Sequence, residues 1–145
     1  MRILIINGPN LNLLGEREPD KYGSKTLAQI NDEISAFASS KGVDVEFFQS
    51  NIEGEIVTAI QNAKGKYDGI IINPAAYTHT SVAIRDAILG TQIKAIEVHL
   101  SNVYSREEFR QTTYTAGVCI GQITGFGEYG YHLAILALLK VLNLY

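Results

Sequence analysis

Short apolar segments alternate with helical patterns along the whole chain, and this alternation limits the possible folds more than any other feature. Five segments read as strands because they are short and rich in Ile and Val: 3–6, 43–48, 69–72, 95–98 and 118–124. Ile3–Ile6 is apolar throughout, which predicts a strand buried on both faces. Strands of this kind occur in parallel sheets whose two faces are covered by helices.

Helical patterns separate the predicted strands. Thr26 and Gln29 form a candidate capping box for a helix with one apolar face that ends near Gly42. Further helices are expected from Ser50 and Glu53, over 81–89, as a short capped segment at Ser105 and Glu108, and over 128–142.

This alternation predicts a single α/β domain spanning residues 1–145. Right-handed crossovers would join five parallel strands into a doubly wound sheet. By analogy with common folds of this size, we choose the flavodoxin-like strand order 2-1-3-4-5.

Composition excludes several classes of protein. The formal net charge of −3 argues against a broad nucleic-acid-binding face. The single cysteine, Cys119, rules out an intramolecular disulfide and lies in an apolar run, which favours a buried, inert thiol. The apolar stretches 3–6 and 133–139 are too short for a secretion signal and a membrane span, respectively, so we expect a soluble cytoplasmic protein.

Polar and charged side chains follow the first, third and fourth predicted strands. In a doubly wound sheet, ligands bind beyond the carboxyl ends of the strands, near the point where the strand order reverses. The three strands are neighbours in the chosen order, so a site is expected where these segments meet: 7–12 with Arg17 and Tyr22, 73–81, and 99–102 with Arg106 and Arg110.

Each candidate also has a purely structural interpretation. The segment 8–24 is long enough to be a lid. Tyr77 and His132 are interpreted as structural, whereas Glu97 would either orient a neighbouring group or pair with a cation. Other structural alternatives are turn formation by Asn10 and Asn12, a surface ion pair for Arg17, and helix capping by His79.

Motifs for metals and nucleotides are absent from the sequence. His79 and His99 follow different strands without a nearby Cys or an HExxH spacing, and there is neither a GxGxxG nor a Walker loop. Gly125–Gly127 could offer N–H groups to an anion, although an ordinary turn is slightly favoured.

Four motifs, in order, resemble those of type II 3-dehydroquinate dehydratases, and the likeness covers essentially the whole chain. Ala75 stands where that family usually has glycine, and the segment 111–113 is less basic than expected. The motifs are 6–15 with 17–19 and 22–23, then 73–81, then 97–102, and finally 106–110 with 127–131.

The resemblance implies a flavodoxin-like enzyme that removes water from 3-dehydroquinate by anti elimination through an enolate, without cofactor or metal. Tyr22 would be the base and His99 the acid, with Arg17 supporting the tyrosinate and Asn10 holding a water on the enolate oxygen. The remaining implied site residues are Asn73, His79, Leu100, Ser101 and Arg110 for the substrate carboxylate and hydroxyls, Arg106 as support, and Asp86 from a neighbouring subunit. The implied assembly is a dodecamer built from trimers.

The chemistry of these residue types agrees with the implied roles. Tyrosine has an ordinary pKa of about 10, which a nearby arginine lowers by favouring the anion. Histidine can supply a proton near neutral pH, and arginines suit an anionic substrate. The resemblance leaves open whether such an enzyme serves aromatic biosynthesis or quinate breakdown.

Two other classes are compatible with the expected fold. A receiver-like signalling domain should carry acidic residues after its first and third strands, where this chain has amides, and a flavin-binding module would absorb visible light. A purely structural oligomer subunit would not need Tyr22, Arg17 and His99 together. Oligomerisation itself is expected because the final helix, 133–142, is apolar almost all round.

Overall fold

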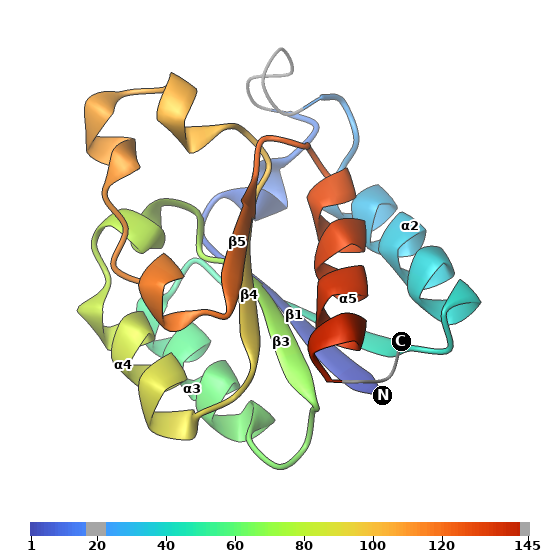
Figure 1. The fold of residues 1–145 in the computed structure, drawn as a ribbon. Helices are drawn as coiled ribbons and strands as arrows, with labels where there is room; N and C mark the ends of the chain where they lie inside the picture. The colour runs from blue at the N-terminus through green and yellow to red at the C-terminus, as the bar shows by residue number, and fades with distance from the viewer. Residues whose placement is uncertain (17–22, 143–145) are drawn as a thin grey trace.

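A five-stranded parallel sheet with helices on both faces forms the protein (Figure 1). The computed structural model describes residues 1–16 and 23–142. The strand order is β2-β1-β3-β4-β5, which confirms the predicted doubly wound topology. The strands are β1 (Arg2–Asn7), β2 (Asp44–Gln49), β3 (Gly69–Asn73), β4 (Ala95–His99) and β5 (Gly121–Thr124).

Two pairs of helices cover the sheet, one pair on each face (Figure 1). None of the described helices is both long and apolar enough to cross a membrane. On one face lie α2 (Leu27–Ser40) and α5 (Tyr129–Val141), and on the other lie α3 (Glu53–Ala63) and α4 (Val82–Thr91). Short 3-10 helices occupy several connections: η1 (Leu11–Leu13), η2 (Ala75–His79), η3 (Val103–Ser105), η4 (Glu108–Gln111) and η5 (Ala116–Val118).

The alternation of side chains along β1 explains its continuous apolar sequence. Ile3 and Ile5 belong to the core cluster beneath α2 and α5, whereas Leu4 and Ile6 belong to the cluster beneath α3 and α4. Because successive side chains point to opposite faces, a strand between two helical layers must be apolar at every position.

Local signals predict some helix ends correctly. Thr26 and Gln29 form the predicted capping box: the Thr26 N–H donates to Gln29 Oε1 (2.9 Å) and the Gln29 N–H to Thr26 Oγ1 (3.2 Å). Ser81 caps α4 by accepting a hydrogen bond from the Ile84 N–H at 2.9 Å.

Between β4 and α5, one predicted helix was wrong, and the predicted fifth strand is present but shorter than expected. The capped helix expected at Ser105 and Glu108 is instead two separate 3-10 helices, and the Ser105 hydroxyl donates to the Asn102 carbonyl. The fifth strand begins only at Gly121, because residues 116–118 turn as a 3-10 helix before the chain reaches the sheet.

The apolar final helix packs against more of its own chain than expected. α5 packs on the sheet and also against α2, so Leu136 and Ala137 are half-buried against the same core cluster. The surplus of exposed leucines is therefore not seen in the described part of α5. Large apolar side chains are exposed elsewhere instead, including Val82 and Leu89 on α4, and Tyr104, Phe109 and Tyr114 after β4.

Cys119 is half-buried and packs against the core cluster beneath α3 and α4. Burial raises the pKa of its thiol to about 12. A thiol that stays protonated is a poor nucleophile, which agrees with the predicted inert role.

Substituting Gly8 should distort the junction between the loops after β1 and β3. A Cβ at Gly8 would lie 2.6 Å from the Pro74 carbonyl oxygen, and the Gly8 N–H already donates to the Asn73 carbonyl at 2.8 Å. We expect Gly8→Ala to lower the free energy of unfolding by about 1–3 kcal/mol, because backbone must move to admit the methyl group.

The matched control is Gly54→Ala, since a Cβ at Gly54 in α3 meets nothing within 4 Å. That change should stabilise the protein by about 0.5–1 kcal/mol through helix propensity. Urea unfolding of both variants would measure the difference, and equal stabilities would contradict the predicted clash.

Candidate active site

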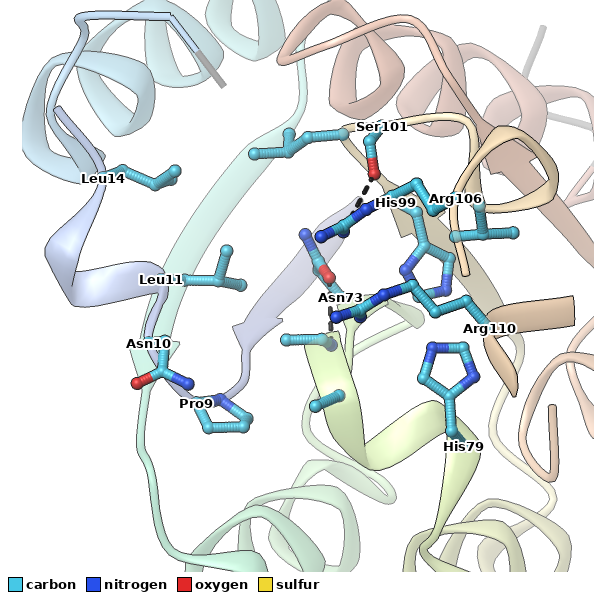
Figure 2. A pocket seen from close by; sticks show the side chains of 14 residues that line it. Pro9, Asn10, Leu11, Leu14, Asn73, His79, His99, Ser101, Arg106 and Arg110 are labelled. Carbon is cyan, nitrogen blue, oxygen red and sulfur yellow. Dashed lines mark hydrogen bonds between the residues drawn. The ribbon is translucent and has the colours of Figure 1, made fainter. Parts of the chain in front are cut away.

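A cavity of about 150 Å³ lies at the carboxyl ends of β1, β3 and β4 (Figure 2). This is the edge of the sheet where the sequence predicted a site. Arg17 and Tyr22 lie outside the described residues. Among the predicted site residues that the structure describes, all but Asp86 line the cavity: Asn10, Asn73, His79, His99, Leu100, Ser101, Arg106 and Arg110.

The cavity collects side chains from both faces of the sheet. Ile96 and Val98 on β4 belong to the core cluster beneath α2 and α5, so Glu97 and His99, which alternate with them, point to the face that α3 and α4 cover. Asn73 follows Ile71 by two residues on β3 and shares its face, which α2 and α5 cover.

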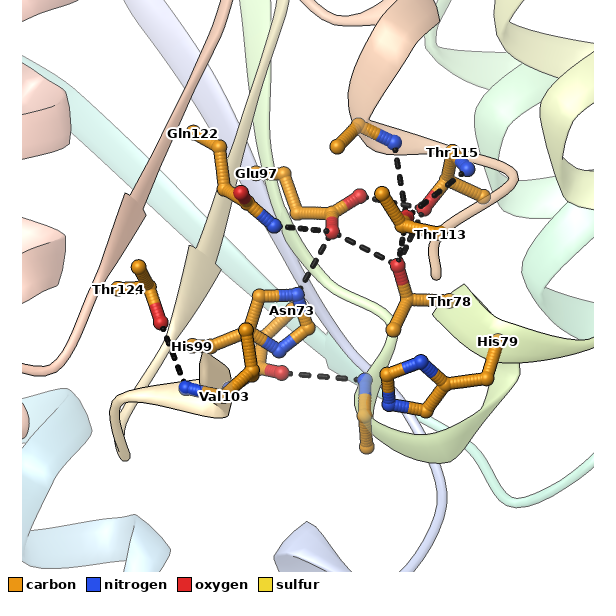
Figure 3. Close-up of polar contacts among 12 residues, drawn as sticks. Asn73, Thr78, His79, Glu97, His99, Val103, Thr113, Thr115, Gln122 and Thr124 are labelled. Atoms are coloured by element: carbon orange, nitrogen blue, oxygen red, sulfur yellow. Dashed lines mark hydrogen bonds and ion pairs between the residues drawn. The ribbon is translucent and has the colours of Figure 1, made fainter. Parts of the chain in front are cut away.

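Glu97 is fully buried, and its carboxylate organises one side of the site (Figure 3). The described residues supply four hydrogen-bond donors to its two oxygens. His99 Nε2 lies 2.6 Å from Oε2, which also accepts from Thr78 Oγ1 at 2.8 Å and from Gln122 Nε2 at 3.2 Å. Thr115 Oγ1 donates to the other oxygen, Oε1. Only an ionised carboxylate accepts at both oxygens without donating, so Glu97 is a carboxylate.

The same contacts control the proton on His99. Burial alone would raise the pKa of Glu97, but the hydrogen bonds from His99, Thr115 and Thr78 outweigh burial and leave its pKa below the ordinary value. His99 Nε2 must carry a hydrogen to donate to the carboxylate, which leaves Nδ1 as the ring nitrogen available to a ligand. A histidine ring held by a carboxylate at one nitrogen is oriented to transfer a proton through the other, so the pair has the geometry of a general acid.

The threonines around Glu97 belong to the candidate site, and sequence reasoning missed them. Thr113 hydrogen-bonds Thr78 through its hydroxyl and accepts the N–H groups of Thr115 and Ala116, each at 3.2 Å. The only signal in the sequence is the run Thr112–Thr113 near Thr115, which by itself suggests no more than a less basic pocket rim. Of the two interpretations open for Glu97, the structure therefore supports orientation of a neighbouring group.

His79 reaches the cavity from η2 with a defined tautomer. Its Nδ1 lies 2.7 Å from the Thr112 carbonyl and must donate to it, so Nε2 is an acceptor in the neutral ring. The ring also meets Phe109 edge-on, with centroids 6.1 Å apart. Ser81, rather than His79, caps α4, so the capping interpretation of His79 is wrong.

Two arginines give the cavity its positive charge. Arg106 is largely buried, and its Nη1 lies 3.4 Å from Ser101 Oγ. Arg110 Nε donates to Glu107 Oε1 at 3.1 Å, and the Arg110 guanidinium lies 4.9 Å from the centre of the Phe109 ring. The hydrogen bond from Arg110 lowers the pKa of Glu107. Two guanidinium groups at one cavity favour an anionic ligand.

The loops after β1 and β3 hold two residues in the left-handed backbone region. Asn10 has φ +69°, and its N–H donates to Asn51 Oδ1 at 3.0 Å. Ala75 has φ +52° and lines the cavity, with its N–H donating to Asn73 Oδ1 at 3.1 Å. The methyl group of Ala75 thus occupies a conformation that glycine adopts without strain.

Asp86 lies apart from the cavity, exposed on α4. It shares a helix face with the exposed Val82 and Leu89, which precede and follow it by four and three residues. Within one chain, this carboxylate does not line the cavity.

The remaining candidates have structural roles. Tyr77 packs against the core beneath α3 and α4 and donates to the Asn51 carbonyl at 2.7 Å, as predicted. His132 stacks on Phe37 with centroids 4.5 Å apart. The N–H groups of Gly125 and Gly127 donate to the carbonyls of His99 and Leu100, so this turn is not an anion site.

Comparisons with known proteins agree on one family. Residues 1–139 match the family model described as dehydroquinase class II. A 3-dehydroquinate dehydratase from a Nitratiruptor species is 57% identical over 141 residues, covering 97% of this chain and 90% of its own. One from Clostridium perfringens is 58% identical over 141 residues, covering 97% of each chain.

Solved structures give the same result. The type II dehydroquinase from Butyrivibrio crossotus superposes with a TM-score of 0.93 at 52% identity, covering 95% of this chain and 97% of that one. The type II dehydroquinase from Propionibacterium acnes has a TM-score of 0.92 at 38% identity and 96% coverage of each chain.

Replacing Glu97 with glutamine should destabilise the protein in a pH-dependent way. A glutamine side chain has one acceptor oxygen and cannot satisfy all four donors, so we expect a loss of about 2–3 kcal/mol at pH 7. Because the folded-state pKa of Glu97 is lowered, its stabilising effect is complete above the ordinary value of 4.5 and is lost as the pH falls through the folded value.

The stability advantage of the wild type over Glu97→Gln should therefore be constant above pH 4.5 and shrink below it. Urea unfolding across this pH range would measure the advantage. Exposed Glu108 provides the control, since Glu108→Gln should follow the wild-type curve. An advantage that grows on acidification would contradict the ionised state of Glu97.

Proposed function

The chain belongs to the class II dehydroquinase family, and on that premise we propose that it is a 3-dehydroquinate dehydratase, a hydro-lyase that converts 3-dehydroquinate to 3-dehydroshikimate. The observation that carries the proposal is the buried His99–Glu97 pair, which lies at one cavity together with two arginines. Aromatic biosynthesis or quinate breakdown would use this reaction, and we expect the enzyme in the cytoplasm.

Two proton transfers make up the proposed reaction. Tyr22 removes a proton beside the ketone, and the electron pair forms an enolate. The enolate then expels the hydroxyl group as His99 gives it a proton, so one water leaves on the opposite face of the ring. Carbon is neither oxidised nor reduced overall, so the step needs no redox cofactor.

The base requires a lowered pKa, because tyrosine is neutral at pH 7. Arg17 would supply this by stabilising the tyrosinate, at roughly 1.4 kcal/mol for each unit of pKa. Asn10 would hold a water on the enolate oxygen, and its left-handed backbone, fixed by Asn51, places it at the cavity.

The acid is supported by the described contacts of His99. Glu97 holds Nε2, so Nδ1 is the ring nitrogen that faces a ligand and would give a proton to the leaving hydroxyl. Positioned proton donors of this kind contribute about 10²–10⁴-fold to rate.

Substrate recognition matches the polarity of the cavity. Arg110 and the segment Leu100–Ser101 would bind the carboxylate, with Arg106 supporting Ser101 at 3.4 Å. His79 Nε2 would accept a hydrogen bond from a ring hydroxyl, since Nδ1 is committed to Thr112. Asn73 would contact the substrate from the end of β3.

A spectrophotometric assay tests the activity directly. Purified protein mixed with 3-dehydroquinate should produce the conjugated enone, seen as rising ultraviolet absorbance, and chelation followed by dialysis should leave the rate unchanged. Tyr22→Phe should lower kcat by orders of magnitude with KM nearly unchanged, because it removes the base alone.

Tyr77→Phe is the matched control. It removes a hydroxyl that donates to the Asn51 carbonyl at 2.7 Å, at a cost of about 1 kcal/mol in stability, without removing a catalytic group. Equal losses of kcat in the two variants would mean that Tyr22 is not the base.

The proposal extends to a homo-oligomer, a dodecamer built from trimers, in which Asp86 reaches a neighbour's site. Its support is the exposed α4 face, where Val82 and Leu89 flank the carboxylate outside the cavity of its own chain. Exposed apolar side chains on one helix face are typical of subunit interfaces.

Mixing subunits tests the shared site. Asp86→Ala and Tyr22→Phe proteins should each be weakly active, and exchanging their subunits should restore activity because some sites receive both intact residues. Sedimentation would give the assembly size. A fully active monomer, or no gain on mixing after proven exchange, would contradict the shared site.

A further inference from the structure

A buried hydrogen-bond network of Asn7, Asn73 and Tyr131 lies behind the cavity, on the face of the sheet that α5 covers. Asn7 ends β1 and Asn73 ends β3, and the two are paired in register. Tyr131, from the first turn of α5, contacts both side chains. The three residues are at most 2% exposed, and only Asn73 lines the cavity (Figure 2).

The direction of each hydrogen bond in this network follows from one backbone group, the Ala75 N–H. The Ala75 N–H can only donate, so the Asn73 atom 3.1 Å away must be Oδ1. Asn73 Nδ2 therefore faces Tyr131, 3.2 Å from its hydroxyl oxygen, and must donate to it. The Tyr131 hydroxyl accepts this bond and has its own hydrogen left for Asn7 Oδ1, 2.5 Å away.

We infer that Tyr131 is a positioning residue that fixes the amide of Asn73 in one of its two orientations. Without the phenol oxygen, the amide would lose its only described acceptor on this side. The Asn73 side chain could then rotate, or its amide could flip and exchange the positions of its oxygen and nitrogen, because a buried N–H without an acceptor costs free energy. This inference rests on the proposed function in that Asn73 is the residue that contacts the substrate.

The orientation decides what Asn73 presents to a ligand. Oδ1 accepts from Ala75, and one hydrogen of Nδ2 goes to Tyr131, so the second hydrogen of Nδ2 is the amide hydrogen left for a ligand. Asn73 thus offers a donor to an accepting oxygen of the substrate. Burial raises the pKa of Tyr131 far above its ordinary value, so the phenol stays neutral and the polarity holds across the working pH range.

Tyr131→Phe tests the inference, since it retains the buried ring and removes only the hydroxyl. KM for 3-dehydroquinate should rise about three- to tenfold, as expected for a weakened neutral hydrogen bond, while kcat changes less than about twofold. In an Asn73→Ala background the same substitution should leave KM unchanged, because Tyr131 acts through the amide.

Ile135→Val provides the control for general loosening of α5. Ile135 is fully buried in the same helix and core cluster, and this change should lower stability without raising KM. If Tyr131→Phe does not fold, Asn7→Ala keeps the tyrosine and removes the acceptor of its hydrogen. The phenol hydrogen can then point toward Asn73 and oppose the bond from Nδ2, so KM should again rise.

Crystal structures of the variants give a readout that is independent of activity. Asn73 should be rotated or displaced in Tyr131→Phe and unchanged in Ile135→Val. If the wild type fails to dehydrate 3-dehydroquinate, the proposed function falls, and the position of Asn73 still decides the role of Tyr131. An unmoved Asn73, an unchanged KM, or an equal KM increase in the Asn73→Ala background would each overturn the inference.

Discussion

The buried Glu97 carboxylate is the group on which the rest of the site depends. A charge that leaves water must be compensated by hydrogen bonds, or its desolvation would cost several kcal/mol. The donors come from β4, β5, η2 and the loop before η5 (Figure 3). Compensating one charge therefore joins four segments at the carboxyl edge of the sheet, and it also holds His99 in the orientation that acid chemistry needs.

The two faces of the sheet contribute different halves of the cavity. On the face of α3 and α4, a charged group orients His99, the proposed proton donor. On the face of α5, neutral groups orient Asn73, the proposed substrate contact. The Glu97 carboxylate fixes which nitrogen of His99 faces the cavity, whereas the neutral amides and the phenol of Tyr131 keep a fixed hydrogen-bond polarity over the working pH range. Strand ends support both halves, and strands hold side chains more precisely than loops do.

Much of the fold could be predicted because its signals are local. The apolar strands and the Thr26 capping box agree with the structure, and so does the strand order, which was chosen by analogy with common folds. The errors fall between β4 and α5, where a helix cap at Ser105 and a strand over 118–124 were predicted. In that stretch the backbone follows long-range contacts, such as the Tyr114 N–H donating to the Thr78 carbonyl. The propensities of neighbouring residues contain no information about such long-range contacts.

The sequence by itself determined the parallel sheet, the edge at which the site lies, and most of the segments that line it, because strand period and strand ends are local properties. Only the tertiary structure decided which atoms meet. Thr115 and Gln122 reach Glu97 across 18 and 25 residues, and Tyr131 reaches Asn7 across 124. It also decided that α2 covers the leucines of α5. Side-chain partners this far apart are set by how helices pack on the sheet, and no periodicity within a segment encodes that packing.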